Sequence, residues 1–348
     1  MRFNDTLIVV FSAFLMTDRK LNVLYISDTS NKKINNSGFR PVIINCAKAC
    51  QTYHILFPLH KNHGVLTEKI GDNITLEPAN ARGGLLCIML KSTVVGIRRL
   101  RQFDKNHPSV ITVFQPFECG LIGFMISRLT GTPLNVELRN DYFSEPYSSH
   151  TFWSDKKLAN RMRYLFARWL LRRADSVLSV AGGRMSKSLV DFGVKPERIH
   201  ILPTVVDTAD FTPASPREFT KETLEIVSLT RLHKQKNVLL LIKAFDRAAS
   251  RMPNLKLTLV GIKLKKNNLS TIFSNTLREA KNKDKITVLP WSQDTPDHLK
   301  QADIYALSSD YEGCARVLTE AMAAGLPNVT KHTQHLSLIH ISEPTRPY

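Results

Sequence analysis

The sequence predicts an α/β protein built from two units, each a parallel sheet wound with helices. From residue 21 onward, short apolar runs alternate with amphipathic stretches, which is the pattern of strands and crossover helices. The alternation stops at a segment rich in Pro, Thr and Asp, residues 204–220, and then restarts. The 348 residues give each unit the length of an ordinary domain.

The first unit, residues 21–203, begins with the buried strand LNVLYIS at 21–27. A polar loop is expected at 140–155, and Gly131 stands where a glycine ends a helix. The other predicted strands are 53–59, 110–114, 133–139, 176–181 and 198–203. The predicted helices are 42–50, 85–106, 119–131, 156–173 and 183–193.

The second unit, residues 221–327, repeats this pattern after the linker at 204–220. Its predicted strands are 224–229, 255–261, 286–290 and 304–309. Its predicted helices are 237–252, 269–282, 296–303 and 316–325. Two such units predict a bilobal molecule with its ligand site in the cleft between the lobes.

Net charge is the unusual feature of the composition. Lys and Arg number 48 against 30 Asp and Glu, a formal charge of +18. Residues 1–205 hold 28 of the basic residues and 15 of the acidic ones, so most of the excess lies in the first half. This excludes an acidic disordered regulator and predicts a polyanionic partner: nucleic acid, anionic lipid or a phosphorylated ligand.

The basic charge is densest in residues 156–173, which hold seven Lys or Arg and no acid. Apolar residues recur there at helical spacing and predict one apolar face. They are Leu158, Met162, Leu165, Phe166, Trp169 and Leu170. Two interpretations stay open: a core helix with a solvated basic face, or a helix that docks on anionic lipid, with 97–105 adding to the patch. The sequence has no nucleic-acid-binding motif, so we expect no nucleic-acid partner.

Five cysteines without a CxxC pair or a Cys/His cluster are typical of reduced cytoplasmic thiols and exclude a disulfide scaffold. The apolar stretch from Leu7 to Met16 is too short to span a bilayer and lacks a signal-peptide cleavage site. We therefore expect a cytoplasmic protein, attached peripherally to the inner face of the plasma membrane if the basic helix docks on lipid. Nothing orients His332, His335 and His340 as metal ligands, so we expect no metal there.

The most informative segment runs from Ser309 to Pro327, SDYEGCARVLTEAMAAGLP. It predicts a strand end, a tight glycine turn and a helix beginning near Arg316. Free backbone N–H groups from Arg316 to Leu318, with the helix dipole, would form an anion site suited to a diphosphate. The carboxylates of Glu312 and Glu320 could accept hydrogen bonds from sugar hydroxyls.

Four blocks in order resemble the family-4 retaining glycosyltransferases. Residues 309–327 resemble the E-x7-E signature of that family, with Glu312 and Glu320 as the two acids. The other blocks are SLTRLHKQKNVLLLIKAF at 228–245, RIHILPTVVDTADFTP at 198–213 and ADIYALSSDYEG at 302–313. The resemblance implies two Rossmann-like lobes facing across a cleft, the GT-B type. Residues 21–203 would be the acceptor-side domain and 221–327 the nucleotide-sugar-binding domain.

The resemblance also implies the roles of individual residues. Arg231 and Lys236 would bind the donor diphosphate and stabilise the charge on the leaving nucleotide, with backbone groups at Val317 and Leu318 beside them. These cations and the helix N-terminus would take the place of a metal, so no metal and no cofactor is expected beyond a UDP-type or GDP-type donor sugar.

The transferred sugar and the nucleoside would lie on the neighbouring residues. The resemblance implies that Glu312, with the backbone of Gly313 and Cys314, holds the transferred sugar. Glu320 would hold the ribose hydroxyls, and the loop 290–292 with Trp291 would border the base.

This sequence departs from the family pattern at several positions. Thr230 and Asn237 stand where glycines are usual, so we expect a bulkier phosphate-facing loop. After the strand at 133–139, a histidine is usual in the family. Arg139 and Asp141 are found there, either as a cation and an acceptor-orienting base or in structural roles. Residues 328–348 are too short to complete the second sheet and look like a non-native tail, so we expect an incomplete second lobe.

The resemblance implies transfer of a sugar from a nucleotide-diphosphate donor to a polysaccharide or lipid-linked acceptor, with retention at the anomeric carbon. One alternative is a degenerate, non-catalytic nucleotide-sugar binder or a partner subunit of an active transferase. A nucleotide-sugar epimerase on the same fold is a third hypothesis, which the E-x7-E block disfavours.

Overall fold

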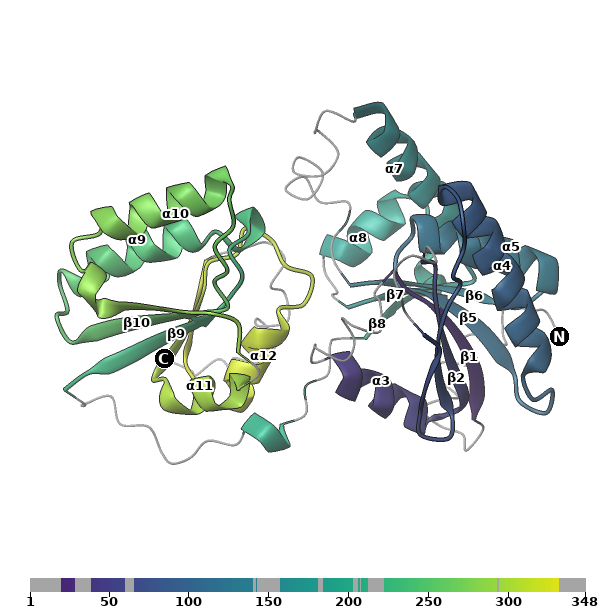
Figure 1. The fold of residues 1–348 in the computed structure, drawn as a ribbon, viewed down its shortest axis with the longest axis horizontal. Coiled ribbons are helices and arrows are strands. Elements are labelled where there is room, and N and C mark those ends of the chain that lie inside the picture. Colours follow the sequence, from purple (N-terminus) through teal and green to yellow (C-terminus); the bar gives the residue numbers. More distant parts are fainter. Residues whose placement is uncertain are drawn as a thin grey trace. The chain divides into compact units, whose positions relative to one another are not determined.

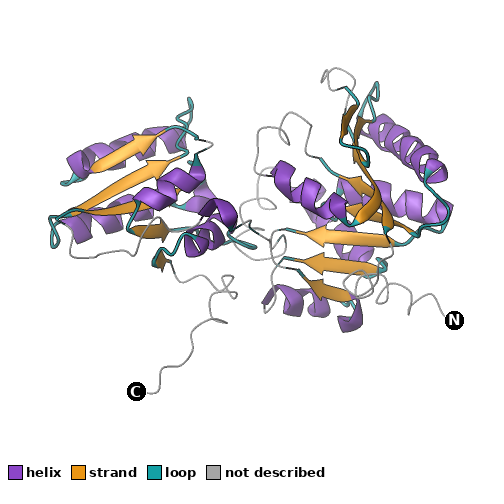
Figure 2. Cartoon of the chain, turned by 90° about the horizontal axis from the view of Figure 1, so that it is seen from below, coloured by secondary structure: helices purple, strands orange, loops and turns teal. Residues whose placement is uncertain are grey.

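A computed structural model of the chain describes residues 20–28, 39–59, 66–139, 142, 157–180, 184–202, 206, 208–211, 222–292 and 294–331. The chain forms two compact units, Met1–Pro203 and Thr204–Tyr348. In each unit, helices cover both faces of a largely parallel sheet (Figures 1 and 2). The predicted α/β architecture is confirmed. The stretch from Leu7 to Met16, Asp141 and the histidines after Lys331 lie outside the described residues.

The sheet of the first unit has the order β3-β4-β2-β1-β5-β6-β7-β8, and only the β3–β4 pair is antiparallel. Its strands are β1 (Leu21–Ile26), β2 (Cys50–Phe57), β3 (Glu68–Ile70), β4 (Ile74–Pro78), β5 (Ser109–Val113), β6 (Leu134–Leu138), β7 (Ser176–Ser179) and β8 (Ile199–Ile201). Its helices are α3 (Phe39–Lys48), α4 (Leu85–Gln102), α5 (Glu118–Thr130), α7 (Lys157–Leu171) and α8 (Arg184–Asp191), with a 3-10 turn η2 (Pro196–Arg198).

Two parts of the first unit differ from the sequence-based expectation. The sequence predicts no element for 60–84, but β3 and β4 form a hairpin there, whose turn includes Gly71 at φ 65°. The predicted helix at 42–50 ends at Lys48, and Cys50 already begins β2. The helix α5 ends as expected, because Gly131 adopts the left-handed conformation and its N–H donates to the Ser127 carbonyl.

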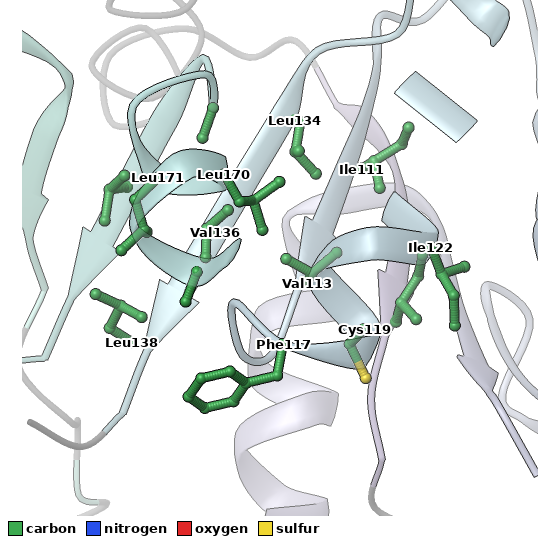
Figure 3. Packing of buried hydrophobic residues seen from close by; sticks show 14 of the residues in the cluster. Ile111, Val113, Phe117, Cys119, Ile122, Leu134, Val136, Leu138, Leu170 and Leu171 are labelled. Atoms are coloured by element: carbon green, nitrogen blue, oxygen red, sulfur yellow. The ribbon is translucent and has the colours of Figure 1, made fainter. Parts of the chain in front are cut away.

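The core of the first unit lies on both faces of its sheet, because alternate residues of β1 point in opposite directions. Leu24 and Ile26 pack with residues of α5 and α7, whereas Val23 and Tyr25 pack with residues of α3. Figure 3 shows the first layer, where strand residues such as Val113 and Val136 meet helix residues such as Leu170. None of the described helices is long and apolar enough to cross a bilayer.

The apolar face predicted for α7 is only partly correct. Ala167, Leu170 and Leu171 are fully buried in the core. Met162 and Leu165, which the helical spacing placed on the same face, are 60% and 49% exposed. The helix therefore carries apolar side chains on its outer surface as well as on its inner one.

The sheet of the second unit is entirely parallel, in the order β11-β10-β9-β12-β13. Its strands are β9 (Leu224–Leu229), β10 (Leu255–Val260), β11 (Ile286–Leu289), β12 (Ile304–Leu307) and β13 (Asn328–Thr330). Its helices are α9 (Val238–Ala249), α10 (Asn268–Glu279), α11 (Thr295–Gln301) and α12 (Arg316–Ala323). Its 3-10 turns are η3 (Ala209–Phe211), η4 (Lys234–Lys236) and η5 (Lys283–Lys285).

Two segments at the borders of the second unit differ from the predicted boundaries. Residues 328–330 were expected to lie outside the domain, but they form β13, which pairs with β12. Phe211 belongs to the predicted linker, yet it is buried among residues of α11 and α12. The rest of the core lies on the other face, where α9 and α10 cover β10.

A half-buried ion pair joins β4 of the first sheet to α4. The Glu77 carboxylate on β4 accepts hydrogen bonds from the Arg99 guanidinium at 2.6 and 2.7 Å and contacts His54 Nε2 at 2.9 Å. Burial raises the pKa of Glu77, but the hydrogen bonds from His54 and Arg99 outweigh it and lower that pKa to about 2. The ionised carboxylate is therefore the form that the folded unit stabilises.

This pair predicts a loss of stability in acid. The folded pKa of Glu77 lies below its unfolded value, so its contribution is complete above about pH 4.5 and is lost as pH falls toward 2. The Glu77→Gln variant should lose about 3 kcal/mol near neutral pH and less in acid. Urea unfolding of the first unit at pH 7 and pH 3 measures this. Glu197→Gln, at a carboxylate 54% exposed, is the control; an equal loss at both pH values contradicts the prediction.

Candidate functional site

The strand order of the second sheet reverses between its neighbouring strands β9 and β12. From β9 the chain adds β10 and β11 on one side, and β12 and β13 then follow on the other. In sheets of this type, ligands bind at the carboxyl ends of the strands where the order reverses. The loops after β9 and β12, residues 230–237 and 308–315, lie at this point. They carry most of the residues that the sequence marks for the donor.

An ion pair joins the two loops. The Lys236 ammonium donates to the Glu312 carboxylate, and the two side chains are only 15% and 7% exposed. The Ser308 hydroxyl donates to the Lys236 carbonyl at 2.9 Å. The two candidate residues thus lie together and are largely shielded from solvent, where charge interactions are strong.

Further hydrogen bonds fix the loops on either side of that pair. The N–H of Asp310 donates to the Gln235 carbonyl at 2.8 Å, and the Gln235 amide donates to the Tyr311 carbonyl at 2.9 Å. The Asp310 carboxylate also accepts from the Lys331 ammonium at 2.6 Å. Both loops are therefore held through their backbones as well as through the charged pair.

Asn237 shows how the loop does without the usual glycine. It has φ 44° and ψ 46°, the left-handed region that glycine and asparagine adopt most readily. Its side-chain amide donates to the Asp310 carboxylate at 2.8 Å. The expectation of a merely bulkier loop is therefore incomplete, because this residue keeps the glycine-like backbone and adds a contact to the opposite loop.

The loop after β9 also needs a close backbone approach. Thr230, the other position without the usual glycine, is buried, and its N–H donates to the Val260 carbonyl at 2.8 Å. Gly261 lies opposite at φ 98°, where a Cβ would come within 2.6 Å of the Thr230 carbonyl oxygen. Arg231 follows with an exposed side chain; its carbonyl accepts from the Thr230 hydroxyl, but its guanidinium makes no hydrogen bond or ion pair with any residue that the structure describes. Its guanidinium is free to bind an anion.

The helix α12 carries Glu320, the second acid of the E-x7-E motif. Glu320 is buried and its carboxylate lies 2.8 Å from Arg316 Nε, one turn earlier. Burial raises the pKa of Glu320, and the nearby Arg316 offsets only part of that effect. The N–H of Leu318 donates to the Ala315 carbonyl at 2.9 Å, so it does not point freely to a ligand as the sequence predicts.

The remaining predicted site residues lie in less enclosed places. Gly313 is buried beside Glu312, and Cys314 is a half-buried free thiol in the turn before α12. Val317 is half-buried in the first turn of α12, whereas Trp291, after β11, is 56% exposed. A wide, exposed ring after an edge-side strand is suited to stacking on a base, but no contact joins it to the ion pair.

The sequence pattern does not mark two buried hydroxyl groups in this part of the second unit. Tyr305 and Ser309 are almost fully buried, and their hydroxyls have no hydrogen-bond partner among the described residues. Burial raises the pKa of Tyr305 far above its usual value, and the charges of Glu312 and Glu320 add to that effect. A tyrosine in a strand gives no signal of its own, because its pattern is that of any core aromatic.

Arg139, the described candidate of the first unit, pairs with a buried acid of its own sheet. The Arg139 guanidinium donates to the buried Glu137 carboxylate at 2.7 Å, and the Tyr25 hydroxyl donates to the other oxygen of that carboxylate at 2.7 Å. Burial lowers the pKa of Arg139, but the neighbouring Glu137 outweighs it and raises the pKa above its usual value. Of the two roles left open for Arg139, the ion pair with Glu137 favours the structural one. Among the described residues, no three His, Cys, Asp or Glu side chains could hold a metal ion.

Both units match families of known proteins. Residues 213–338 match the family Glycosyl transferases group 1, and residues 77–204 match the Glycosyl transferase 4-like domain. The chain is 28% identical over 206 residues to the mannosylfructose-phosphate synthase of Agrobacterium fabrum, covering 56% of this chain. It spans under half of that relative's length, 44%.

Another relative and the solved structures match more of the chain. The UDP-Gal:alpha-D-GlcNAc-diphosphoundecaprenol alpha-1,3-galactosyltransferase of Escherichia coli is 23% identical over 285 residues, which cover 78% of this chain and 70% of that protein. The crystal structure of Anabaena HepE with UDP and glucose has a TM-score of 0.68 at 16% identity and covers 93% of this chain and 83% of that one. Sucrose-phosphate synthase of Thermosynechococcus elongatus has a TM-score of 0.67 at 13% identity, covering 92% and 83%. The fold of this chain is the GT-B fold.

The conformation of Asn237 predicts different results for two replacements. Asn237→Gly keeps the left-handed backbone and should change the free energy of unfolding by less than about 1 kcal/mol. Asn237→Ala loses both the favourable conformation and the hydrogen bond to Asp310, and should destabilise the second unit by about 1–2 kcal/mol. Chemical unfolding measures both, with Asn268→Ala, at an exposed first residue of α10, as the control. Equal losses for glycine and alanine would show that the backbone conformation is unimportant.

Proposed function

We propose that this chain, as a glycosyltransferase of the GT-B fold, moves a sugar from a nucleotide-diphosphate donor to an acceptor hydroxyl with retention. The premise of this proposal is the match of its two units to glycosyltransferase families. The observation that carries the proposal is the Lys236–Glu312 pair at the strand-order reversal of the second sheet. It combines a cation for the diphosphate with a carboxylate for sugar hydroxyls at one place.

The residues divide the chemistry between them. The bond between the anomeric carbon and the diphosphate breaks, the acceptor hydroxyl oxygen takes its place on the same face of the sugar, and the hydroxyl proton passes to the departing diphosphate. Arg231 and Lys236 stabilise the charge that accumulates on the leaving diphosphate, because fixed cations act strongly where water is excluded. Glu312 and the backbone of Gly313 and Cys314 bind the transferred sugar, and Glu320 binds the ribose hydroxyls. Both acids are buried, and each is held by a basic partner.

The Lys236–Glu312 pair has a consequence for donor binding. In the structure the two charges neutralise each other. A diphosphate that binds Lys236 competes with Glu312 for the ammonium. Arg231 binds the second negative charge of the diphosphate. Release of Glu312 from Lys236 then leaves the carboxylate oxygens free to accept from the sugar hydroxyls. Diphosphate and sugar binding are thereby coupled.

For the acceptor we propose a lipid-linked oligosaccharide or a growing polysaccharide. The name of the Escherichia coli relative states a diphosphoundecaprenol-linked acceptor, and a second relative, from Campylobacter jejuni, is also named for a diphospho-undecaprenol substrate. Such acceptors lie at a membrane, which supports a cytoplasmic location with peripheral attachment to the inner face of the plasma membrane.

Removal of either cation should reduce transfer. Arg231 is exposed, so Arg231→Ala should do this with little effect on folding, whereas Lys236→Ala also leaves the buried Glu312 without its partner. Lys236→Ala and Arg231→Ala should each lower kcat/KM for the donor about 100-fold or more, because each removes charge stabilisation at the leaving group. Lys236→Arg should keep part of the activity. Lys234→Ala, an exposed lysine on the same turn, is the matched control and should change little.

The assay is sugar transfer or donor hydrolysis with UDP-sugars and GDP-sugars, beside a titration with UDP and GDP. Unchanged turnover in both alanine variants contradicts the assignment of the site. Nucleotide binding without hydrolysis or transfer by the unmodified protein would instead favour a non-catalytic nucleotide-sugar binder or partner subunit.

A further inference from the structure

The outer surface of α7 is unusual for a helix that also packs into a core. Three large apolar side chains are exposed on it: Met162 at 60%, Leu165 at 49% and Trp169 at 36%. Arg161 is exposed one residue before Met162, and Arg172 and Arg173 are exposed just after the helix. At 100° per residue, Arg161, Met162, Leu165 and Trp169 fall within one third of the helix circumference, and Arg172 and Arg173 follow in the turn after it. We call these six residues the docking face.

Aromatic contacts tie the docking face to α5. The Trp169 ring meets the Phe124 ring edge-on, with centroids 4.9 Å apart, and stacks on Phe166 at 5.7 Å. The Arg173 guanidinium lies 4.4 Å above the Trp169 ring, and Arg128 of α5 lies 4.9 Å above Phe124. Cations over aromatic rings keep the rings in place while their charges stay exposed to solvent.

The charge of this surface has one sign. Residues 156–173 contain no acid. Glu118 of α5 pairs with Arg163 at 2.9 Å, and Arg163 is not part of the docking face. Arg172 donates to the Phe192 carbonyl, a neutral group, so its charge is not neutralised. Basic side chains therefore surround an exposed apolar strip.

We propose that the docking face binds the anionic headgroup layer of a lipid bilayer, with Met162, Leu165 and Trp169 entering the boundary between headgroups and acyl chains. Arginines attract acidic headgroups, and exposed Leu, Met and Trp side chains gain by leaving water for that boundary. A nucleic-acid backbone would use the arginines but would bury little of the aliphatic surface. This docking goes beyond sugar transfer, and it would hold the protein where a lipid-linked acceptor lies.

The test uses the full chain and sedimentation with vesicles. Vesicles of phosphatidylcholine with about 30% phosphatidylglycerol should bind the protein, and vesicles of phosphatidylcholine alone should bind it at least tenfold more weakly. A single-stranded oligonucleotide as competitor should not release the protein from the anionic vesicles at physiological salt. Failure to bind the anionic vesicles, or release by the oligonucleotide, overturns the proposal.

Two variants separate the apolar and the basic contributions. Met162→Ser with Leu165→Ser should weaken binding to anionic vesicles about tenfold or more, because two exposed apolar groups are lost. Arg161→Glu with Arg173→Glu should weaken it by a similar or larger factor and remove its salt dependence. The matched control is Arg251→Glu with Met252→Ser, an exposed basic and apolar pair in the second unit, which should bind as the unmodified protein does.

Trp169 itself reports insertion. With Trp153→Phe and Trp291→Phe in place, Trp169 is the remaining tryptophan of the three in the chain. Its emission should shift to the blue with anionic vesicles and should be quenched by brominated acyl chains. An unshifted, unquenched signal in vesicle-bound protein overturns the insertion.

UDP titration distinguishes this proposal from the proposed function. The docking variants should bind UDP as the unmodified protein does. A loss of UDP binding in these variants would show that they damage the fold rather than a lipid surface, and would overturn the proposal while leaving the sugar-transfer assignment untouched.

Discussion

The Lys236–Glu312 ion pair is the interaction on which the candidate site depends. It joins residues 76 positions apart in sequence across the point where the second sheet reverses its strand order. A buried charge without a partner costs several kcal/mol, so each member of the pair requires the other. The hydrogen bonds of Gln235, Asn237 and Ser308 to the facing loop keep the two charges in register.

The alternation of apolar runs and amphipathic stretches predicts the doubly wound architecture and most of its elements, because buried parallel strands and crossover helices leave clear periodic patterns. The β3–β4 hairpin escapes that pattern, because β3 has only three residues, two of them charged, and β4 carries Thr75 and Glu77 between its apolar residues instead of a continuous apolar run. The sequence pattern also does not show that Met162 and Leu165 face outward. Helical spacing groups them with Leu170, and only the packing of α7 decides which apolar residues face the core.

The residues of the site show the same division between what a pattern predicts and what packing decides. Spacing and resemblance mark Lys236, Glu312 and Glu320, but neither reveals that Lys236 and Glu312 form an ion pair. Asn237 reads in the sequence as a lost glycine, whereas its φ of 44° shows that the backbone requirement persists. Arg139 follows a strand like a functional residue, yet its charge is held by the buried Glu137.

The central claim is that a donor diphosphate competes with Glu312 for the Lys236 ammonium. Calorimetric titration of UDP into the Glu312→Gln variant tests this most directly, because the amide keeps the shape of the side chain and removes its charge. Glu312→Gln should bind UDP several-fold more tightly than the unmodified protein while it transfers sugar more slowly. UDP affinity that is unchanged or weaker in this variant would show that Glu312 and the diphosphate do not compete for Lys236.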